Sequence, residues 1–406
     1  MALRPHRIAT SHAGSLPRSE RLIELNGLRA RGELADEAAH ESGLAEAVLD
    51  VVSRQREIGI DIVNDGEYGH SMRTPYDYGA WWSYVLPRLG GLEIVDVPLR
   101  DTVQVRRSSV PGELVLSPFR DRRDWNTFAD AYADPDSGVA LPRTDFQARS
   151  PLCRGPIVYI GHDAVARDIA DMKAAMEATG ATDGFLNSVG PASCARIGNE
   201  FYESDEEIIW ACAEAMREEY RAIVDAGLTL QLDDPAIADN WDQIVPEPSV
   251  EAYRRFTKTR IDALNHAIRG LPPERIRFHL CWGSWHGPHV TDIAMADIVD
   301  LMLEVNAGAY SFEAANARHE HEWRVWEDVA LPDGKVILPG VVTHSTNVVE
   351  HPQLVAQRIG RFAGLVGAEN VIASTDCGLG GRIHPQIAWA KLESLVEGAA
   401  IASAGA

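Results

Sequence analysis

The regular alternation of short apolar runs with helical segments constrains this chain more than any other feature of its sequence. Eight runs are rich in β-forming residues, and most are separated by segments with helical periodicity. They span residues 8–15, 60–67, 184–190, 228–235, 275–283, 308–315, 335–342 and 371–378. Such alternation implies parallel strands joined by right-handed crossovers, and eight units predict an α/β fold, a closed (β/α)8 TIM barrel. An open doubly wound sheet is the alternative, but no Gly-x-Gly-x-x-Gly follows a first strand.

The helices between the runs carry local start and stop signals. Residues 204–207 (Ser-Asp-Glu-Glu) have the pattern of a capping box, and the apolar run after them stops at Gly227. Ser249 begins another helix, which we expect to run to Gly270, and Pro352 lies in the first turn of a third. These signals support the alternation of strands and helices.

Residues 76–156 interrupt this rhythm. The segment is rich in Trp, Tyr, Pro, Arg and Asp, including Trp81, Trp82 and Trp125. We expect a long insertion after the second strand, a hairpin and loops near the barrel mouth, because a disordered linker would contain fewer aromatic residues. Residues 1–406 are accordingly predicted to form a single barrel domain that carries this insertion. A small independent domain is the alternative.

Composition and charge exclude several classes of partner. The chain has 406 residues, 45% of them hydrophobic and 24% charged, with a formal net charge of −22. Nucleic acids and anionic membranes are bound by clustered Lys and Arg, so we expect neither as a partner. There is no N-terminal apolar leader or long apolar run, and the five cysteines are no disulfide scaffold. We therefore expect a cytoplasmic protein with reduced cysteines.

Polar side chains close seven of the eight predicted strands. They are Ser15, Glu67, Asp233, His279 with Cys281, Glu313, His344 and Cys377. In a (β/α)8 barrel the carboxyl ends of all strands surround one mouth, where barrel enzymes hold their catalytic residues. So many chemically active residues at strand ends are hard to explain as chance solvation. The sequence therefore predicts an active site at this mouth.

His279 and Cys281 lie two residues apart in an extended segment, so their side chains point to the same side. Imidazole and thiolate are ligands that zinc selects, although the pair alone is as typical of a buried histidine beside a buried free cysteine. Glu313 and Cys377 would complete a four-ligand set, and no C-x2-C knuckle of a structural zinc site is present. Two thiolates and a carboxylate make Zn2+ a weak Lewis acid for water. The ion would still lower the pKa of an incoming thiol, so we predict a zinc site that activates a thiol.

Four motifs carry a family resemblance: His-Leu-Cys (279–281), Ser-Phe-Glu-Ala-Ala-Asn (311–316), Gly-Val-Val-Thr-His (340–344) and Asp-Cys-Gly-Leu (376–379). They resemble the catalytic barrel of the vitamin-B12-independent methionine synthases, a family whose relatives include the epoxyalkane:coenzyme M transferases. The resemblance extends from residues 11–17 to the last strand, and the chain length fits the single-barrel form. It implies a (β/α)8 fold and the transfer of an alkyl group to a zinc-bound thiol.

Residue by residue, the resemblance also implies roles for the strand-end side chains. The implied zinc ligands are His279, Cys281, Glu313 and Cys377. The positions that match those binding the amino and carboxylate groups of homocysteine are Ser15, Glu67 and Asp233. His344 matches the histidine that protonates the departing group, which needs a proton near neutral pH.

The nature of the transfer is left open by the sequence. We expect first a methyl or alkyl transfer to a homocysteine-like thiol from a donor such as 5-methyltetrahydrofolate. The alternative, the second class, adds a thiol such as coenzyme M to an epoxide. The family's synthases have a pterin-stacking tryptophan after the position of Gly190-Pro191, where this chain has Ala-Ser-Cys-Ala-Arg-Ile-Gly. The missing aromatic residue favours the second class.

Other observations bear on the partners. A sulfonate-bearing thiol would need an arginine near the mouth, for which Arg18, Arg196 and Arg382 are candidates. A third class, a zinc- or thiol-binding protein without turnover, would have no need of His344. We expect a small-molecule thiol and a methyl or alkyl donor as partners, and the sequence leaves a homo-oligomer open.

Overall fold

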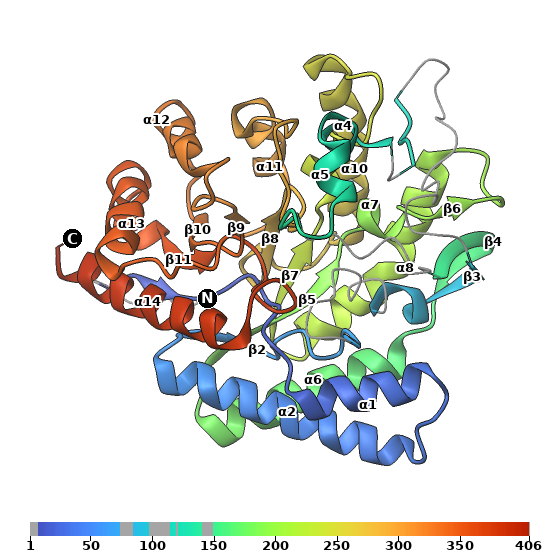
Figure 1. Ribbon diagram of the computed structural model, residues 1–406, viewed down its shortest axis with the longest axis horizontal. Coiled ribbons are helices and arrows are strands. Elements are labelled where there is room, and N and C mark those ends of the chain that lie inside the picture. The colour runs from blue at the N-terminus through green and yellow to red at the C-terminus, as the bar shows by residue number, and fades with distance from the viewer. Residues whose placement is uncertain (1–6, 74–83, 97–113, 119–120, 140–148, 406) are drawn as a thin grey trace.

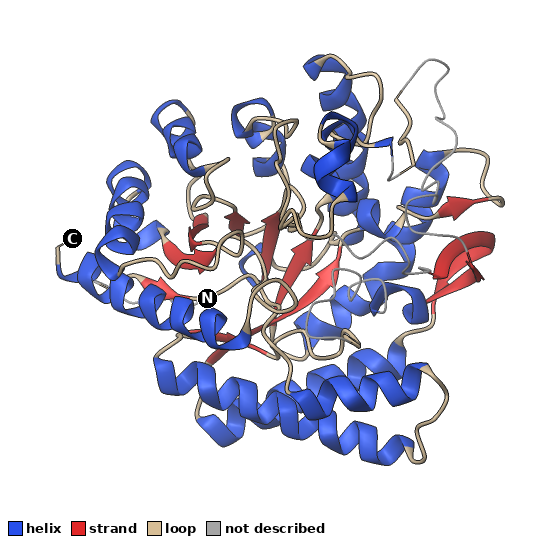
Figure 2. Cartoon of the chain, viewed as in Figure 1, coloured by secondary structure: helices blue, strands red, loops and turns tan. Residues whose placement is uncertain are grey.

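The computed structural model describes residues 7–73, 84–96, 114–118, 121–139 and 149–405, and these form a barrel of parallel strands surrounded by helices (Figure 1; Figure 2). The eight strands run in the order β1-β11-β10-β9-β8-β7-β5-β2 around the sheet, and every pair of neighbours is parallel. Their bounds are β1 (Ala9–Thr10), β2 (Ile62–Asn64), β5 (Asp183–Val189), β7 (Thr229–Asp233), β8 (Ile276–Leu280), β9 (Ala309–Phe312), β10 (Val336–Val342) and β11 (Ile372–Thr375). Each lies within or overlaps one of the eight predicted runs, so the (β/α)8 prediction is confirmed.

Side chains join β1 to β2 at the seam of the barrel. The Asp61 carboxylate accepts hydrogen bonds from the Thr10 backbone N–H at 3.0 Å and from its hydroxyl at 3.1 Å. Beyond them, the Ser11 hydroxyl donates to the Ile62 carbonyl at 3.3 Å. These bonds take the place of a backbone ladder, so the two edge strands are not left as open edges.

Helices cover the outside of the sheet, as Figure 1 shows. The longer ones are α1 (Glu20–Ala30), α2 (Glu37–Ile58), α6 (His162–Thr179), α8 (Asp205–Asp225), α10 (Val250–Ala267), α13 (Pro352–Val366) and α14 (Pro385–Ala404). The shorter ones are α4 (Arg123–Thr127), α5 (Ala129–Ala133), α7 (Pro191–Cys194), α9 (Ala236–Asp239), α11 (Val299–Leu303) and α12 (Val325–Asp328). Single 3-10 turns occur at η1 (Leu86–Arg88), η4 (Pro273–Arg275), η5 (Met295–Asp297), η6 (Glu320–Arg324) and η7 (Ala368–Asn370).

The predicted helix signals act as expected. The Ser204 hydroxyl accepts the backbone N–H of Glu207 at 3.2 Å and caps α8. The Ser249 hydroxyl caps α10 in the same way, and Pro352 is the first residue of α13. The helices α8 and α10 stop two and three residues before the glycines named from the sequence, because the left-handed Gly227 and Gly270 lie in the turns that follow.

A second, three-stranded sheet lies beside the barrel, in the order β3-β4-β6. Strand β3 (Leu89–Asp96) is antiparallel to β4 (Arg149–Tyr159), which pairs in parallel with β6 (Gly198–Asn199). Of the predicted insertion 76–156, residues 76–83, 97–113, 119–120 and 140–148 lie outside the described residues. We propose that the antiparallel pair β3–β4 and helices α4 and α5, which lie between these two strands in the chain, belong to that one insertion after β2.

The interior of the barrel is apolar in one layer and becomes polar toward the mouth. A small apolar layer fills one part and consists of Ala9, Ile62, Phe185, Ala309, Val336, Leu338 and Ile372. Arg277 is buried beside it, with its guanidinium 3.9 Å from the Phe185 ring centre and hydrogen-bonded to Ser11 Oγ and the His12 carbonyl. Above this arginine, polar side chains lead to the mouth.

In the described part of the chain, no helix is long and apolar enough to cross a membrane.

Candidate metal centre

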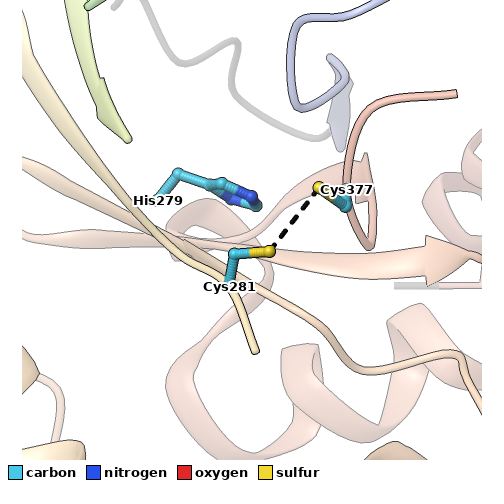
Figure 3. A group of neighbouring side chains, drawn as sticks. All are labelled: His279, Cys281 and Cys377. Atoms are coloured by element: carbon cyan, nitrogen blue, oxygen red, sulfur yellow. Dashed lines mark hydrogen bonds between the residues drawn. The ribbon is translucent and has the colours of Figure 1, made fainter. Parts of the chain in front are cut away.

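His279, Cys281 and Cys377 meet at the carboxyl end of the barrel, as the sequence predicted. His279 is the fourth residue of β8, Cys281 follows that strand directly, and Cys377 follows β11. One potential ligand atom from each lies within 4.8 Å of the other two. Figure 3 shows the imidazole and both thiols pointing toward one another. His279 and Cys281 are buried, and Cys377 is partly exposed.

The spacing of the two sulfurs fits a tetrahedral metal. The Sγ atoms of Cys281 and Cys377 are 3.7 Å apart, and both residues are free cysteines. Two sulfurs that each bind one tetrahedral zinc at about 2.3 Å are about 3.8 Å apart, whereas a disulfide bond is about 2.0 Å long. His279 Nδ1 is 3.0 Å from Ser311 Oγ, and its buried Nε2 has no hydrogen-bond partner among the described residues. The trio therefore offers two sulfurs and one nitrogen with the spacing that a soft divalent metal needs.

The two thiols have unequal acidity. The hydrogen bond from Cys281, and after it the nearby His279, hold the pKa of Cys377 well below its usual value. The same bond to Cys377, with burial, raises the pKa of Cys281 well above its usual value. Burial alone would lower the pKa of His279, but contact with Cys377 outweighs it and raises that pKa. The backbone N–H of Gly283 also donates to Cys281 Sγ at 3.3 Å, a contact that stabilises negative charge on that sulfur.

Glu313, the fourth expected ligand, follows β9 and is held beside the trio. Its Oε1 accepts the backbone N–H of Trp282 at 3.0 Å, and its Oε2 accepts the Asn316 side-chain amide at 2.7 Å. Burial raises its pKa to about 8. Its carboxylate groups with His344 and Asp376 within 4.8 Å, rather than with the imidazole and the two thiols. Glu313 therefore stays a predicted metal ligand. On binding a metal, its carboxylate would either keep the hydrogen bonds from Trp282 and Asn316 or give them up.

His344 lies after β10 in the same neighbourhood. It is 2% exposed, its Nδ1 has no hydrogen-bond partner in the part of the chain that the structure describes, and burial lowers its pKa to about 3. Its carbonyl accepts a hydrogen bond from His286 Nε2 at 2.9 Å, and the two rings lie nearly parallel with centres 6.3 Å apart. The imidazole is therefore neutral at pH 7 and has one buried nitrogen that could accept a proton.

Glu67 and Asp233 form an acidic wall on another side of the mouth. Asp233 ends β7 and is the register partner of His279 on β8. Its carboxylate accepts Asn187 Nδ2 at 2.7 Å and Gln231 Nε2 at 2.8 Å, and burial raises its pKa to about 6. Burial and then Asp233 raise the pKa of Glu67 well above its usual value. Two neighbouring, partly exposed carboxylates with raised pKa values fit a site that receives a cation such as an ammonium group.

The backbone conformations of Glu67 and Gly14 allow the Glu67 carboxylate to lie against the chain after β1. Glu67 has φ +58°, a conformation that non-glycine residues seldom adopt and that is frequent at functional sites. A Cβ on Gly14 would lie 2.4 Å from Glu67 Oε1 and 2.4 Å from Asn187 Nδ2, and Gly14 itself has φ +124°. Only glycine at position 14 allows both side chains to approach the chain after β1.

Ser15, the third expected substrate residue, lies next to the metal-binding loop. A Cβ on Gly378 would be 2.6 Å from Ser15 Cβ, so the chain after Cys377 touches it. Ser15 Oγ accepts a hydrogen bond from Arg18 Nη1 at 2.8 Å, and Arg18 also donates to the Leu16 and Glu67 carbonyls. The structure thus brings the three expected substrate residues to the rim around the trio.

Several residues of the site were not identified from the sequence. Asn187 and Gln231 lie inside predicted strands and donate hydrogen bonds to Asp233. The only feature of the sequence that could have identified them is a polar residue at an interior strand position. Asp376 was seen only as part of a strand end. Its Oδ1 accepts the backbone N–H groups of residues 314 and 315 at 2.7 and 2.8 Å, which ties the Glu313 loop to β11.

Comparisons with known proteins bear on the family of the chain. Residues 139–401 match the family model described as the catalytic domain of cobalamin-independent synthase. The methionine synthase of Thermococcus kodakarensis is 23% identical over 398 residues, covering 97% of this chain and 93% of that protein. The 2-hydroxypropyl-CoM lyase of Xanthobacter autotrophicus is 25% identical, covering 82% and 94%.

A solved structure has the same fold. The B12-independent methionine synthase from Shewanella sp. W3-18-1, in complex with selenomethionine, superposes with a TM-score of 0.69 and 21% identity. The superposition covers 97% of each chain. The fold is therefore shared over nearly the full length of both chains.

Proposed function

Because the chain belongs to the family of cobalamin-independent synthase catalytic domains, we propose that it is a zinc-dependent transferase that moves a methyl or other alkyl group onto a small thiol. The observation that carries this proposal is the trio of His279, Cys281 and Cys377, whose sulfurs are 3.7 Å apart. The donor set of two sulfurs and a nitrogen is one that selects zinc over harder cations.

His279, Cys281 and Cys377 would hold the metal, with Glu313 as the ligand that an incoming thiol replaces. Bound there, zinc would lower the pKa of the thiol substrate and keep it as an electron-rich thiolate. The carboxylate of Glu313 suits the exchangeable position, because the Trp282 N–H and the Asn316 amide can receive it when it leaves the metal.

The thiol substrate is proposed to carry an ammonium group, as homocysteine does. Glu67 and Asp233 supply the carboxylates, and Asn187 orients Asp233. A cation between them would offset the burial that raises both pKa values and the charge of Asp233 that raises the pKa of Glu67 further. Ser15, beside Gly378, is positioned to donate to an acidic group on the same substrate.

His344 is proposed to carry a proton to the departing atom. Because burial keeps its imidazole neutral, the proton has to enter with the substrates, and the thiol S–H is a source. The balance is then complete: the sulfur–carbon bond forms, the bond from carbon to the departing atom breaks, and the thiol proton ends on that atom. General acid catalysis of this kind contributes about 10²- to 10⁴-fold to a rate.

Epoxide alkylation is the second candidate, and one observation favours it over folate chemistry. Residues 191–197, where the family's synthases carry a pterin-stacking tryptophan, are entirely buried. Ser193 Oγ donates to Asp234 Oδ1 at 2.6 Å, and Arg196 forms an ion pair with Asp239 at 2.6 Å. The segment is thus packed against the loop after β7 and presents no aromatic face to a ligand.

A panel of thiols and donors tests the proposal. Zinc-loaded protein is assayed with homocysteine, coenzyme M and glutathione against 5-methyltetrahydrofolate and a short epoxide, with product identified by mass spectrometry. Methylated or hydroxyalkylated homocysteine that disappears in Cys281→Ser supports the proposal. The matched control is Cys212→Ser, which alters a cysteine buried in α8 outside the trio. No alkylated thiol with any pair, from protein that holds zinc, would favour a binding protein without turnover.

A further inference from the structure

The loop that follows β8 begins with one of the two thiols of the metal centre. This thiol loop comprises residues 281–294, between the end of β8 and the start of η5. Within it, the backbone N–H groups of Gly287 and Asp292 donate to the carbonyls of Trp285 and His289, which closes two tight turns. Such turns shape a loop but do not fix where it lies against the barrel, so contacts from other segments have to hold it.

Helices α4 and α5, which lie in the insertion, supply such contacts (Figure 1). The indole N–H of Trp285 donates to the Tyr132 hydroxyl at 2.9 Å, and this hydroxyl donates to Asp124 Oδ2 at 2.6 Å. The other carboxylate oxygen of Asp124 accepts the backbone N–H of Val290 at 3.0 Å. One tyrosine and one aspartate of the insertion thus hold the thiol loop at two positions.

Trp285 connects this anchor to the thiol. Gly283 has φ +91°, and a Cβ at that position would clash with the Trp285 ring, so the indole packs directly against this glycine. The Gly283 backbone N–H in turn donates to Cys281 Sγ at 3.3 Å. The indole also lies 4.1 Å from the His289 ring centre, and the Arg122 guanidinium is 5.0 Å from the indole centre. The position of Trp285 therefore depends on the insertion as well as on its own loop.

The anchor is itself fixed to the loop after β7. Arg122 directly precedes α4, is 1% exposed, and donates to both carboxylate oxygens of Asp239 at 2.6 and 2.8 Å. The backbone N–H of Asp124 donates to Asp242 Oδ1 at 2.9 Å, and the Thr291 hydroxyl donates to the same oxygen at 2.5 Å. The insertion, the loop after β7 and the thiol loop are therefore joined by buried polar contacts.

We propose that Tyr132 is a positioning residue of the metal centre. Its hydroxyl holds Trp285 in place, and the indole in turn keeps the Gly283 N–H against the Cys281 sulfur. The inference rests on the proposed metal centre and gives the insertion, which the transfer itself does not use, a part in metal binding. A loop that is already anchored loses less conformational entropy when the metal binds than a loose one. The Tyr132 hydroxyl therefore raises metal affinity without contacting the metal or a substrate.

Zinc affinity, measured by competition with a chelator, tests this role without turnover. Tyr132→Phe keeps the ring and removes the hydroxyl. A neutral hydrogen bond contributes about 2- to 10-fold to an equilibrium constant, so we expect zinc to bind about 2- to 10-fold more weakly. The matched control is Tyr202→Phe, which removes a half-buried hydroxyl that accepts the Ile157 N–H at 2.9 Å, away from the thiol loop. The control should bind zinc as the native protein does.

A double-mutant cycle separates positioning through Trp285 from a general loss of structure. Trp285→Phe removes the indole N–H that Tyr132 accepts. If the tyrosine acts through this bond, adding Tyr132→Phe to Trp285→Phe should cause no further loss of zinc affinity. The same factor lost in both backgrounds would show that the hydroxyl acts elsewhere and would overturn the inference.

Hydrogen exchange of residues 281–294 in zinc-free protein is a readout that does not need the metal. Tyr132→Phe should speed exchange in this segment by about 2- to 10-fold, and Tyr202→Phe should leave it unchanged. Unchanged zinc affinity or unchanged exchange in Tyr132→Phe would overturn the inference. A native protein that binds no zinc would count against the proposed transfer, whereas the exchange rates would still decide whether Tyr132 holds the thiol loop.

Discussion

Substitution of Gly14 by alanine tests the arrangement of the thiol side most sharply. The new Cβ would lie 2.4 Å from Glu67 Oε1 and 2.4 Å from Asn187 Nδ2, well inside van der Waals contact. Both side chains have to move, and the 2.7 Å bond from Asn187 to Asp233 is lost. We therefore expect the substitution to weaken binding of an ammonium-bearing thiol.

The magnitude follows from two contributions. A non-glycine residue at φ +124° costs about 1–3 kcal/mol of folding free energy. Loss of a hydrogen bond to a charged group costs about 1.5–3 kcal/mol, so thiol binding should weaken by about 10- to 100-fold. Urea denaturation measures the first quantity and calorimetric titration with homocysteine the second, both on zinc-loaded protein.

Gly180→Ala is the matched control. Gly180 also has a positive φ, +66°, but a Cβ there would meet nothing within 4 Å. It should lose about 1 kcal/mol of stability and bind the thiol normally. If Gly14→Ala bound homocysteine as tightly as the Gly180 variant, the placement of the thiol's ammonium group against Glu67 would be refuted.

Three further predictions concern other parts of the site. His344→Asn should retain zinc and lower the turnover number by about 10²- to 10⁴-fold, and an unchanged rate would contradict its role as proton donor. Asn316→Ala removes a donor to Glu313, so competition with a chelator should show zinc affinity altered by about 10- to 100-fold; an unchanged affinity would mean that the carboxylate does not respond to this amide. Burial lowers the pKa of His319, but the hydrogen bonds to Asp292 and Glu322 outweigh burial and raise that pKa to about 10. The positive charge of His319 stabilises the fold fully below about pH 6.5, and this contribution is lost as pH rises toward about 10. The difference in free energy of unfolding between the native protein and His319→Gln, measured by urea denaturation, should therefore shrink across that window.

The barrel was predictable because its strands are buried on both faces. Such strands form continuous apolar runs between helical segments, and all eight runs became strands. The observed strands are shorter than the runs at most carboxyl ends, because the polar residues that close them leave the ladder. Ser15 and Glu67, for example, lie beyond the ends of β1 and β2 and turn toward the mouth.

Convergence of the strand-end residues was predictable from topology alone, and His279, Cys281 and Cys377 illustrate it. The partners of these residues were not. Gln231 lies two residues before Asp233 on β7, but Asn187 reaches Asp233 only because β5 pairs with β7 in register, a relation that no local pattern contains.

Metal analysis combined with X-ray absorption tests the central claim most directly. Protein purified with a thiol reductant and loaded with zinc should hold about one ion per chain, with two sulfur ligands at about 2.3 Å and the remaining ligands nitrogen or oxygen. Addition of homocysteine should raise the sulfur count to three, and Cys377→Ser should abolish tight zinc binding. A chain that binds no zinc under these conditions, or a sulfur count that homocysteine leaves unchanged, would contradict a metal centre that activates a thiol.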